Sequence, residues 1–192
     1  MLWQHYVYRR GSEVYSLWNS LFAERKIRVL YISGRGFDSR SVDVLASFRD
    51  HISSSRCDVE AAKLLLIGFS GYSLSDDLVA RTEQNAQSLE SAFAPMGEVV
   101  NLSMGSDDGH DEQVSANVAL RRGMEAVLSH VQDYTDVILD VSSLPRIVYL
   151  TLLTGLLRHL VPDKSLPNAL ASSRINLQVL VADDAALDAK IR

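Results

Sequence analysis

The segment that decides the fold is Asp136–Arg146, with the sequence DVILDVSSLPR. Its opening residues, Asp136–Leu139, form a short run that is apolar after the first position, as is typical of a strand buried on both faces of a parallel sheet. Pro145 favours the first turn of a helix, and a compact polar loop precedes it. The segment therefore predicts a strand, a loop and a helix in close succession.

Four more runs of the same kind recur along the chain, each of strand length and rich in Val, Ile and Leu. Helical patterns of apolar residues lie between them. Alternating strands and helices predict an α/β fold with a doubly wound, mostly parallel, Rossmann-like sheet of five or six strands. The four other runs are Arg28–Ile32, Lys63–Ile67, Glu98–Leu102 and Ile175–Val181.

An additional helix is predicted before the first strand. Val14, Leu17, Trp18, Leu21 and Phe22 follow the spacing of one apolar helix face. We divide the chain into an N-terminal helical extension, residues 1–26, and a Rossmann-like ligand-binding domain, residues 27–192. The extension is expected to pack on the sheet or at one of its edges.

The composition is that of an ordinary globular protein. The 192 residues are 47% hydrophobic, and the net charge of −5 argues against a protein that coats duplex nucleic acid or an anionic membrane. The single cysteine, Cys57, excludes an internal disulfide, and we expect a cytoplasmic protein. The longest apolar stretch, Ile147–Val161, is shorter than the roughly 20 residues of a membrane span, so we predict a core helix. Its part Ile147–Leu157 is apolar nearly all round and should be covered on two sides, one by the sheet and the other by either a dimer partner or the N-terminal helix with Trp18.

Ligands of open α/β sheets bind at the carboxyl ends of the strands. The loops that follow the first four predicted strands are all rich in Gly and Ser, which allow close backbone approach and supply compact donors. Helix N-termini at the same edge favour anions such as phosphate. The candidate ligand-binding residues are Ser33, Gly34, Arg35, Gly36, Ser70, Gly71, Asp140, Ser142, Ser143 and Arg146.

The first of these loops is close to known phosphate-binding patterns. It lacks the Lys of a P-loop and the third Gly of GxGxxG. It also resembles the SGGxDS loop of PP-loop ATP pyrophosphatases, through Ser33, Gly34, Gly36, Asp38 and Ser39. Arg35 is inserted between the glycines, which would shift the backbone amides that cradle phosphate.

The loop after the fourth strand fits the pattern D-x-[ST]-x-x-x-[RK], through Asp140, Ser142 and Arg146. This resembles the ligand-binding motif of the CARF (CRISPR-associated Rossmann fold) family. The resemblance covers about residues 27–182. It implies a domain that senses cyclic oligoadenylates or related nucleotides, acts as a dimer and controls an attached effector.

The position of Arg146 supports the same site on physical grounds. A cation in the first turn of a helix is unfavourable for the helix dipole, so Arg146 is expected to have an acidic partner. That partner is either a ligand phosphate or Asp140, and the sequence leaves both open. In the first case Arg146 and the loop Ser33–Gly36 face one pocket, with Ser142 between them and Arg35 adding positive charge.

Two other kinds of site rank lower. Asp107, Asp108, His110, Asp111 and Glu112 cluster after the third strand, but solvated acidic loops are common, and we predict no metal and no cofactor. The segment 68–72 reads GxSGx rather than the GxSxG of a hydrolase nucleophile elbow.

These patterns predict a regulatory domain that senses a nucleotide, without enzymatic activity of its own, in a prokaryotic antiviral defence system. The expected partners are a nucleotide ligand and either a second copy of the chain or a downstream effector domain or subunit. Two alternatives remain. One is a nucleotide-processing enzyme, such as a PP-loop-like ATP pyrophosphatase or a nucleotide hydrolase. The other is a structural α/β module of a larger complex.

Overall fold

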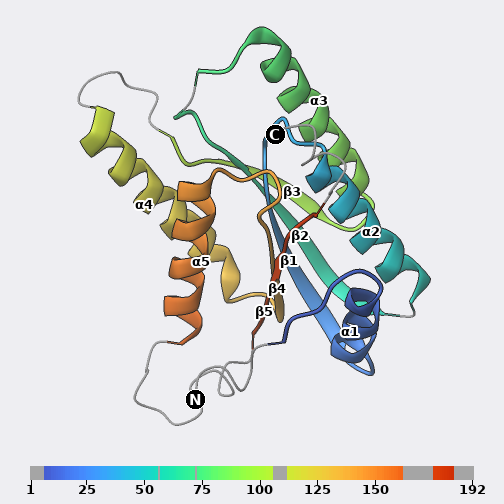
Figure 1. The fold of residues 1–192 in the computed structure, drawn as a ribbon. Coiled ribbons are helices and arrows are strands. Elements are labelled where there is room, and N and C mark those ends of the chain that lie inside the picture. Colours follow the sequence, from blue (N-terminus) through green and yellow to red (C-terminus); the bar gives the residue numbers. More distant parts are fainter. Residues whose placement is uncertain (1–6, 56, 72, 106–111, 162–174, 184–192) are drawn as a thin grey trace.

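The five strands form one parallel sheet in the order β3-β2-β1-β4-β5 (Figure 1). The computed structural model describes residues 7–55, 57–71, 73–105, 112–161 and 175–183. All four neighbouring strand pairs are parallel. The strands are β1 (Lys26–Gly34), β2 (Asp58–Gly68), β3 (Glu98–Ser103), β4 (Asp136–Asp140) and β5 (Asn176–Leu180). The predicted doubly wound, Rossmann-like α/β fold is confirmed, and β1 and β4 lie side by side at the point where the strand order reverses.

Helices cover both faces of the sheet. The helices of the described residues divide between these two faces (Figure 1). The first face carries α4 (Glu112–Val131) and α5 (Arg146–Leu160). The second carries α1 (Glu13–Phe22), α2 (Arg40–Ser54) and α3 (Asp76–Phe93).

The apolar runs of the central strands contribute side chains to the cores on both faces of the sheet, because successive side chains of a strand point to opposite sides. In β1, Leu30 and Ile32 join the core under α4 and α5. Val29 and Tyr31 join the second core, under α1, α2 and α3. All five residues of β4 are buried, which explains why its sequence shows no polar alternation.

The second strand is longer than its apolar run predicts. The run Lys63–Ile67 is only the inner half of β2, which begins at Asp58. The outer half alternates between exposed and partly buried residues and lacks the continuous hydrophobicity that marks the inner half. A shift in register between Ile27 and Arg28 gives β2 one residue more than β1, as in a β-bulge.

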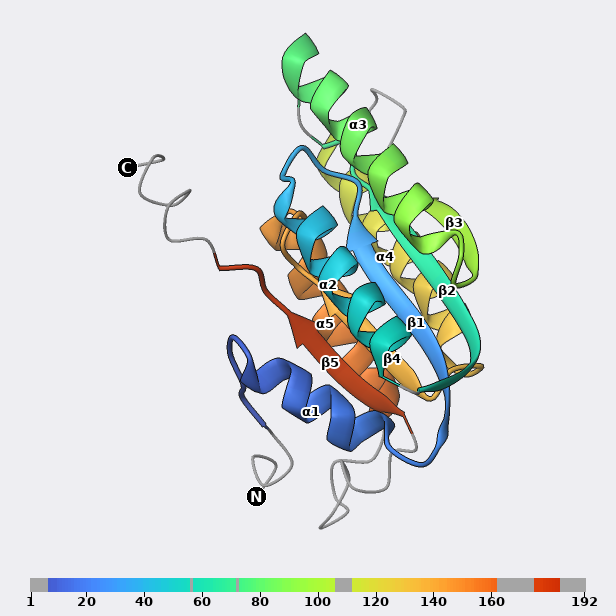
Figure 2. The same ribbon diagram turned by 90° about the vertical axis from the view of Figure 1, so that its right-hand side faces the viewer.

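The N-terminal helix packs on the sheet, but it does not cover α5. Trp18 is buried against Phe48 of α2 and donates from Nε1 to Oε1 of Gln178 on β5, at 2.8 Å. Figure 2 shows α1 beside β5, at the edge of the sheet. Of the two covers expected for the second side of α5, the N-terminal helix with Trp18 is therefore excluded, since α1 and α5 contribute to cores on opposite faces of the sheet.

The outer side of α5 keeps three large apolar residues in solvent. Ile147, Leu150 and Leu157 are 48%, 43% and 43% exposed. Val148, Leu152 and Leu156 on the inner side are fully buried. Within the described part of the chain, neither α5 nor any other helix has the length and apolarity needed to span a membrane.

Candidate functional site at the carboxyl edge of β1 and β4

The loops that follow β1 and β4 touch each other directly. Ser143 donates from Oγ to the carbonyl oxygen of Gly34, at 2.9 Å. A Cβ on Gly34 would lie 2.8 Å from that hydroxyl oxygen and 2.9 Å from the carbonyl carbon of Ser143. A Cβ on Gly36 would lie 2.7 Å from the Ser143 carbonyl oxygen. Both glycines are therefore required by close backbone approach between the two loops.

Asp140 ends β4 beneath these loops, and its side chain is fully buried. Its Oδ1 accepts from the backbone N–H of Ser142, at 3.0 Å. Its Oδ2 accepts from Tyr31 Oη at 3.4 Å and from Ser33 Oγ at 3.3 Å. Arg146 is not among its partners in the described part of the chain. The internal ion pair between Asp140 and Arg146 that the sequence left open is therefore not formed.

Burial controls the ionisation of this carboxyl group. It raises the pKa of Asp140 to about 6, although the hydrogen bonds from Ser142, Ser33 and Tyr31 act in the opposite direction. Burial, together with the neighbouring Asp140 carboxylate, also raises the pKa of Tyr31 well above its usual value. The β1–β4 junction thus holds a carboxyl group that titrates near neutral pH.

Ser142 and Ser143 diverge from one another. Ser143 faces the first loop, whereas Ser142 Oγ accepts from the backbone N–H of Ala182, at 2.9 Å, just beyond β5. Ser143, and not Ser142, is therefore the residue that contacts the loop at Gly34 and Gly36.

The two arginines lie on different sides of the sheet. Arg35 forms an ion pair with Glu83 of α3. Asn85, also on α3, donates to the carbonyl oxygen of Gly36 at 3.0 Å. Arg146 begins α5 on the opposite face, where it is exposed. Arg35 is thus paired with α3, whereas Arg146 begins a helix that packs on the other face of the sheet.

Ser70 and Gly71 follow β2 and are both exposed. A Cβ on Gly105 would lie 2.6 Å from the backbone nitrogen of Ser70, so the loops after β2 and β3 also approach closely. At the carboxyl edge of the sheet, the loops after β2 and β3 therefore meet, as do the loops after β1 and β4.

Exposure separates the candidates into two groups. Ser33, Gly34 and Asp140 are buried and out of reach of a ligand. The candidates near β1 and β4 that a ligand can reach are Arg35, Gly36, Ser142, Ser143 and Arg146, all partly or fully exposed. This set offers the Ser142 hydroxyl group and the guanidinium of Arg146, which suit an anion, whereas the guanidinium of Arg35 is paired with Glu83.

Asp38, which the PP-loop comparison includes, has a local partner. It accepts from the backbone N–H of Arg40 at 3.0 Å, at the start of α2, and forms an ion pair with the same residue. Burial raises the pKa of Asp38, but the hydrogen bonds and charge of Arg40 outweigh it and hold that pKa below its usual value. Asp38 therefore stabilises the start of α2.

Several sequence candidates lie outside the described residues. These are Asp107, Asp108, His110 and Asp111 of the acidic loop and Tyr72 of the segment 68–72. Among the residues that the structure does describe, no group of three or more metal-ligating side chains is found.

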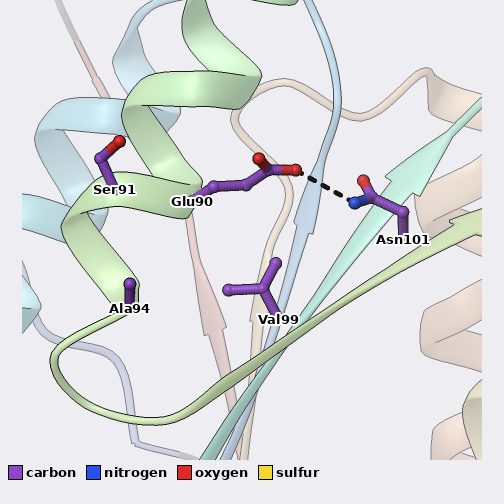
Figure 3. A pocket seen from close by; sticks show the side chains of 5 residues that line it. All are labelled: Glu90, Ser91, Ala94, Val99 and Asn101. Atoms are coloured by element: carbon purple, nitrogen blue, oxygen red, sulfur yellow. Dashed lines mark hydrogen bonds between the residues drawn. The ribbon is translucent and has the colours of Figure 1, made fainter.

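The sequence did not predict a hollow between α3 and β3. It has a volume of about 380 Å³ and lies between the last turns of α3 and the outer strand (Figure 3). Asn101 donates from Nδ2 to Glu90 Oε1 across it, at 3.0 Å. The signal in the sequence is the polar Asn101 in the middle of β3, between Val100 and Leu102, which is typical of an edge position.

Comparison with protein-family models gives no match, and comparison with curated proteins gives none either.

Proposed function

We propose that the carboxyl edge at β1 and β4 binds a nucleotide and that the domain senses this ligand rather than converting it. The observation that carries the proposal is the contact between the two loops, Ser143 Oγ to the Gly34 carbonyl, at the switch point of a doubly wound sheet. Ligands of such sheets bind at this position. The motif Asp140, Ser142 and Arg146 lies at the same point and resembles that of CARF domains, which supports a cyclic oligoadenylate and a role in prokaryotic antiviral defence.

Arg146 is the group on which the proposal depends most. It is exposed at the first residue of α5, and no ion pair to it is found within the described residues. A ligand phosphate would offset the unfavourable interaction between the Arg146 guanidinium and the N-terminus of α5, and that helix terminus would itself favour the phosphate. Ser142 would contribute its hydroxyl proton, while Ser143 keeps its hydroxyl on the Gly34 carbonyl and the buried Asp140 holds the loop through the Ser142 amide.

The test is titration calorimetry of the full chain with cyclic oligoadenylates, linear oligoadenylates and ATP. We expect one of these ligands to bind, and Arg146→Ala to weaken that binding by about tenfold or more, the effect of one lost charge-assisted hydrogen bond. Arg158→Ala is the matched control, because it removes the same charge from the exposed last turn of the same helix. Absence of binding in the wild-type protein, or equal loss in both variants, would refute the site.

We further propose that the domain forms a homodimer through the outer side of α5. Ile147, Leu150, Thr154 and Leu157 are exposed, and their spacing of three, four and three residues reads the same in both directions. An antiparallel pair of helices about a twofold axis requires such a self-complementary surface. Sedimentation velocity should show a dimer that Leu150→Lys converts to a monomer, and a wild-type monomer at high concentration would contradict the proposal.

A second candidate, a structural module, is favoured by one specific observation. Direct packing between the two loops itself buries Ser33, Gly34 and Asp140. In that case the calorimetric titrations would show no nucleotide binding, while Gly34 and Asp140 would matter only for stability.

A further inference from the structure

The hollow between α3 and β3 lies at the opposite edge of the sheet from β5, away from the β1–β4 loops. Its walls come from Glu90, Ser91 and Ala94 of α3 and from Val99 and Asn101 of β3. Figure 3 shows the Glu90 and Asn101 side chains directed toward each other, with Val99 beneath them. We call this feature the α3/β3 hollow.

The main chain of β3 beside the hollow has no strand partner on its outer side in the described part of the sheet. Within the described part of the sheet, β3 pairs only with β2, in a register without shifts. Met104 donates its backbone N–H to the Gly68 carbonyl, at 2.8 Å. Because backbone groups alternate in direction along a regular strand, the N–H and C=O groups of Val99, Asn101 and Ser103 point away from β2. The residues with outward backbone groups thus include both β3 residues that line the hollow.

The side chains of the hollow offer acceptors that are not used. Glu90 Oε1 already accepts from Asn101 Nδ2. In the described part of the chain, Glu90 Oε2 and Asn101 Oδ1 make no hydrogen bond, and no cation pairs with Glu90. Val99 and Ala94 provide an apolar wall beside these oxygens. A cationic group on an aliphatic stem matches this combination.

The charge of α3 is complementary to such a group. The helix carries Asp76, Asp77, Glu83 and Glu90 against the single Arg81. Asp77 pairs with Arg81 at 3.4 Å and Glu83 pairs with Arg35, which leaves Glu90 as the carboxylate available within the hollow. The local field therefore favours a basic partner.

We propose that the open edge of β3 and the α3/β3 hollow together bind an extended basic segment of a partner protein by strand addition. The outward backbone groups of Val99 and Asn101 pair with the main chain of that segment. An arginine or lysine side chain of the segment enters the hollow and donates to Glu90 and Asn101. Main-chain pairing gives affinity in this mode of recognition, and the pocket beside the edge gives specificity.

The experiment is fluorescence anisotropy of the full chain with a fluorescein-labelled hexapeptide of alternating threonine and valine that carries one central arginine. A second peptide has glutamate in place of the arginine, and a third is N-methylated at alternate amides. We expect saturable binding of the arginine peptide alone. Glu90→Gln should weaken it by about tenfold, the effect of one lost charge-assisted hydrogen bond.

Glu125→Gln is the matched control, since Glu125 is an exposed residue of α4 on the other face of the sheet. It should leave peptide binding unchanged, and circular dichroism should show both variants folded. No binding of the arginine peptide, equal binding of all three peptides, or equal effects of the two substitutions would overturn the proposal. Dimerisation of the chain that Glu90→Lys abolishes would overturn it in favour of a second copy at this edge.

Discussion

Asp140→Asn should make the protein more stable at neutral pH. The folded protein holds the pKa of Asp140 at about 6, against the 3.8 of an ordinary aspartate. Because the folded-state value is the higher one, Asp140 contributes its full stability below pH 3.8, and that contribution is lost as the pH rises through 6. The difference corresponds to about 3 kcal/mol, at roughly 1.36 kcal/mol for each pKa unit.

An asparagine keeps the contacts without the charge. Its oxygen can accept from the Ser142 backbone N–H, and its amide nitrogen can donate to the hydroxyl groups of Tyr31 and Ser33, which now donate to Oδ2. The variant does not titrate, so its advantage over the wild type grows with pH. The linkage relation places about half of the 3 kcal/mol between pH 5 and pH 7.5.

The assay is urea unfolding of wild type and variant at pH 5 and pH 7.5, followed by circular dichroism. Asp58→Asn, which removes an exposed carboxylate at the start of β2, is the control for the loss of a negative charge and should change the stability at pH 7.5 less than Asp140→Asn does. If the difference for Asp140→Asn did not change with pH, folding would not raise the pKa of Asp140, and the reasoning would fail. A stabilising substitution at a strand end would also mark Asp140 as a residue kept for a purpose other than stability.

Two further substitutions test the packing that positions the loops. Asp136→Ala should lower the free energy of unfolding in urea by about 3 kcal/mol, because it removes the buried carboxylate that Arg25 binds through hydrogen bonds of 2.9 and 2.7 Å. A loss below about 0.5 kcal/mol would show that this ion pair does not stabilise the core. Gly34→Ala should lower the free energy of unfolding by about 1–3 kcal/mol, since its Cβ would clash with Ser143. Gly68→Ala is the control, because its Cβ would have its nearest neighbour 3.7 Å away, and equal losses in the two variants would contradict the close approach of the loops.

The arrangement of the strands was predictable because it depends on local signals. Continuous apolar runs such as Asp136–Leu139 indicate strands buried on both faces, and the intervening helices enforce parallel connections. The burial of Trp18 and Phe22 followed from helical spacing. The sequence did not reveal which face α1 covers, since a helix that precedes the first strand can pass to either side.

The candidate site was less predictable, because side-chain directions in loops depend on turn geometry. Adjacent residues diverge, so that Ser143 contacts the first loop while Ser142 contacts Ala182. The partner of Arg35, Glu83, lies far along the chain and is brought near only by the packing of α3. The α3/β3 hollow likewise arises from tertiary packing, and its one sign in the sequence is the polar Asn101 in the middle of β3.

The most direct test of the central claim is to locate the ligand on the protein by nuclear magnetic resonance. Amide resonances of the ¹⁵N-labelled full chain would be followed during titration with the cyclic oligoadenylate, linear oligoadenylate or ATP that binds in calorimetry. The account predicts that the largest shifts fall on Gly36, Ser142, Ser143 and Arg146, and that Arg146→Ala abolishes them at the same ligand concentration. Absence of shifts with every nucleotide, or shifts confined to residues away from the β1–β4 edge, would contradict it.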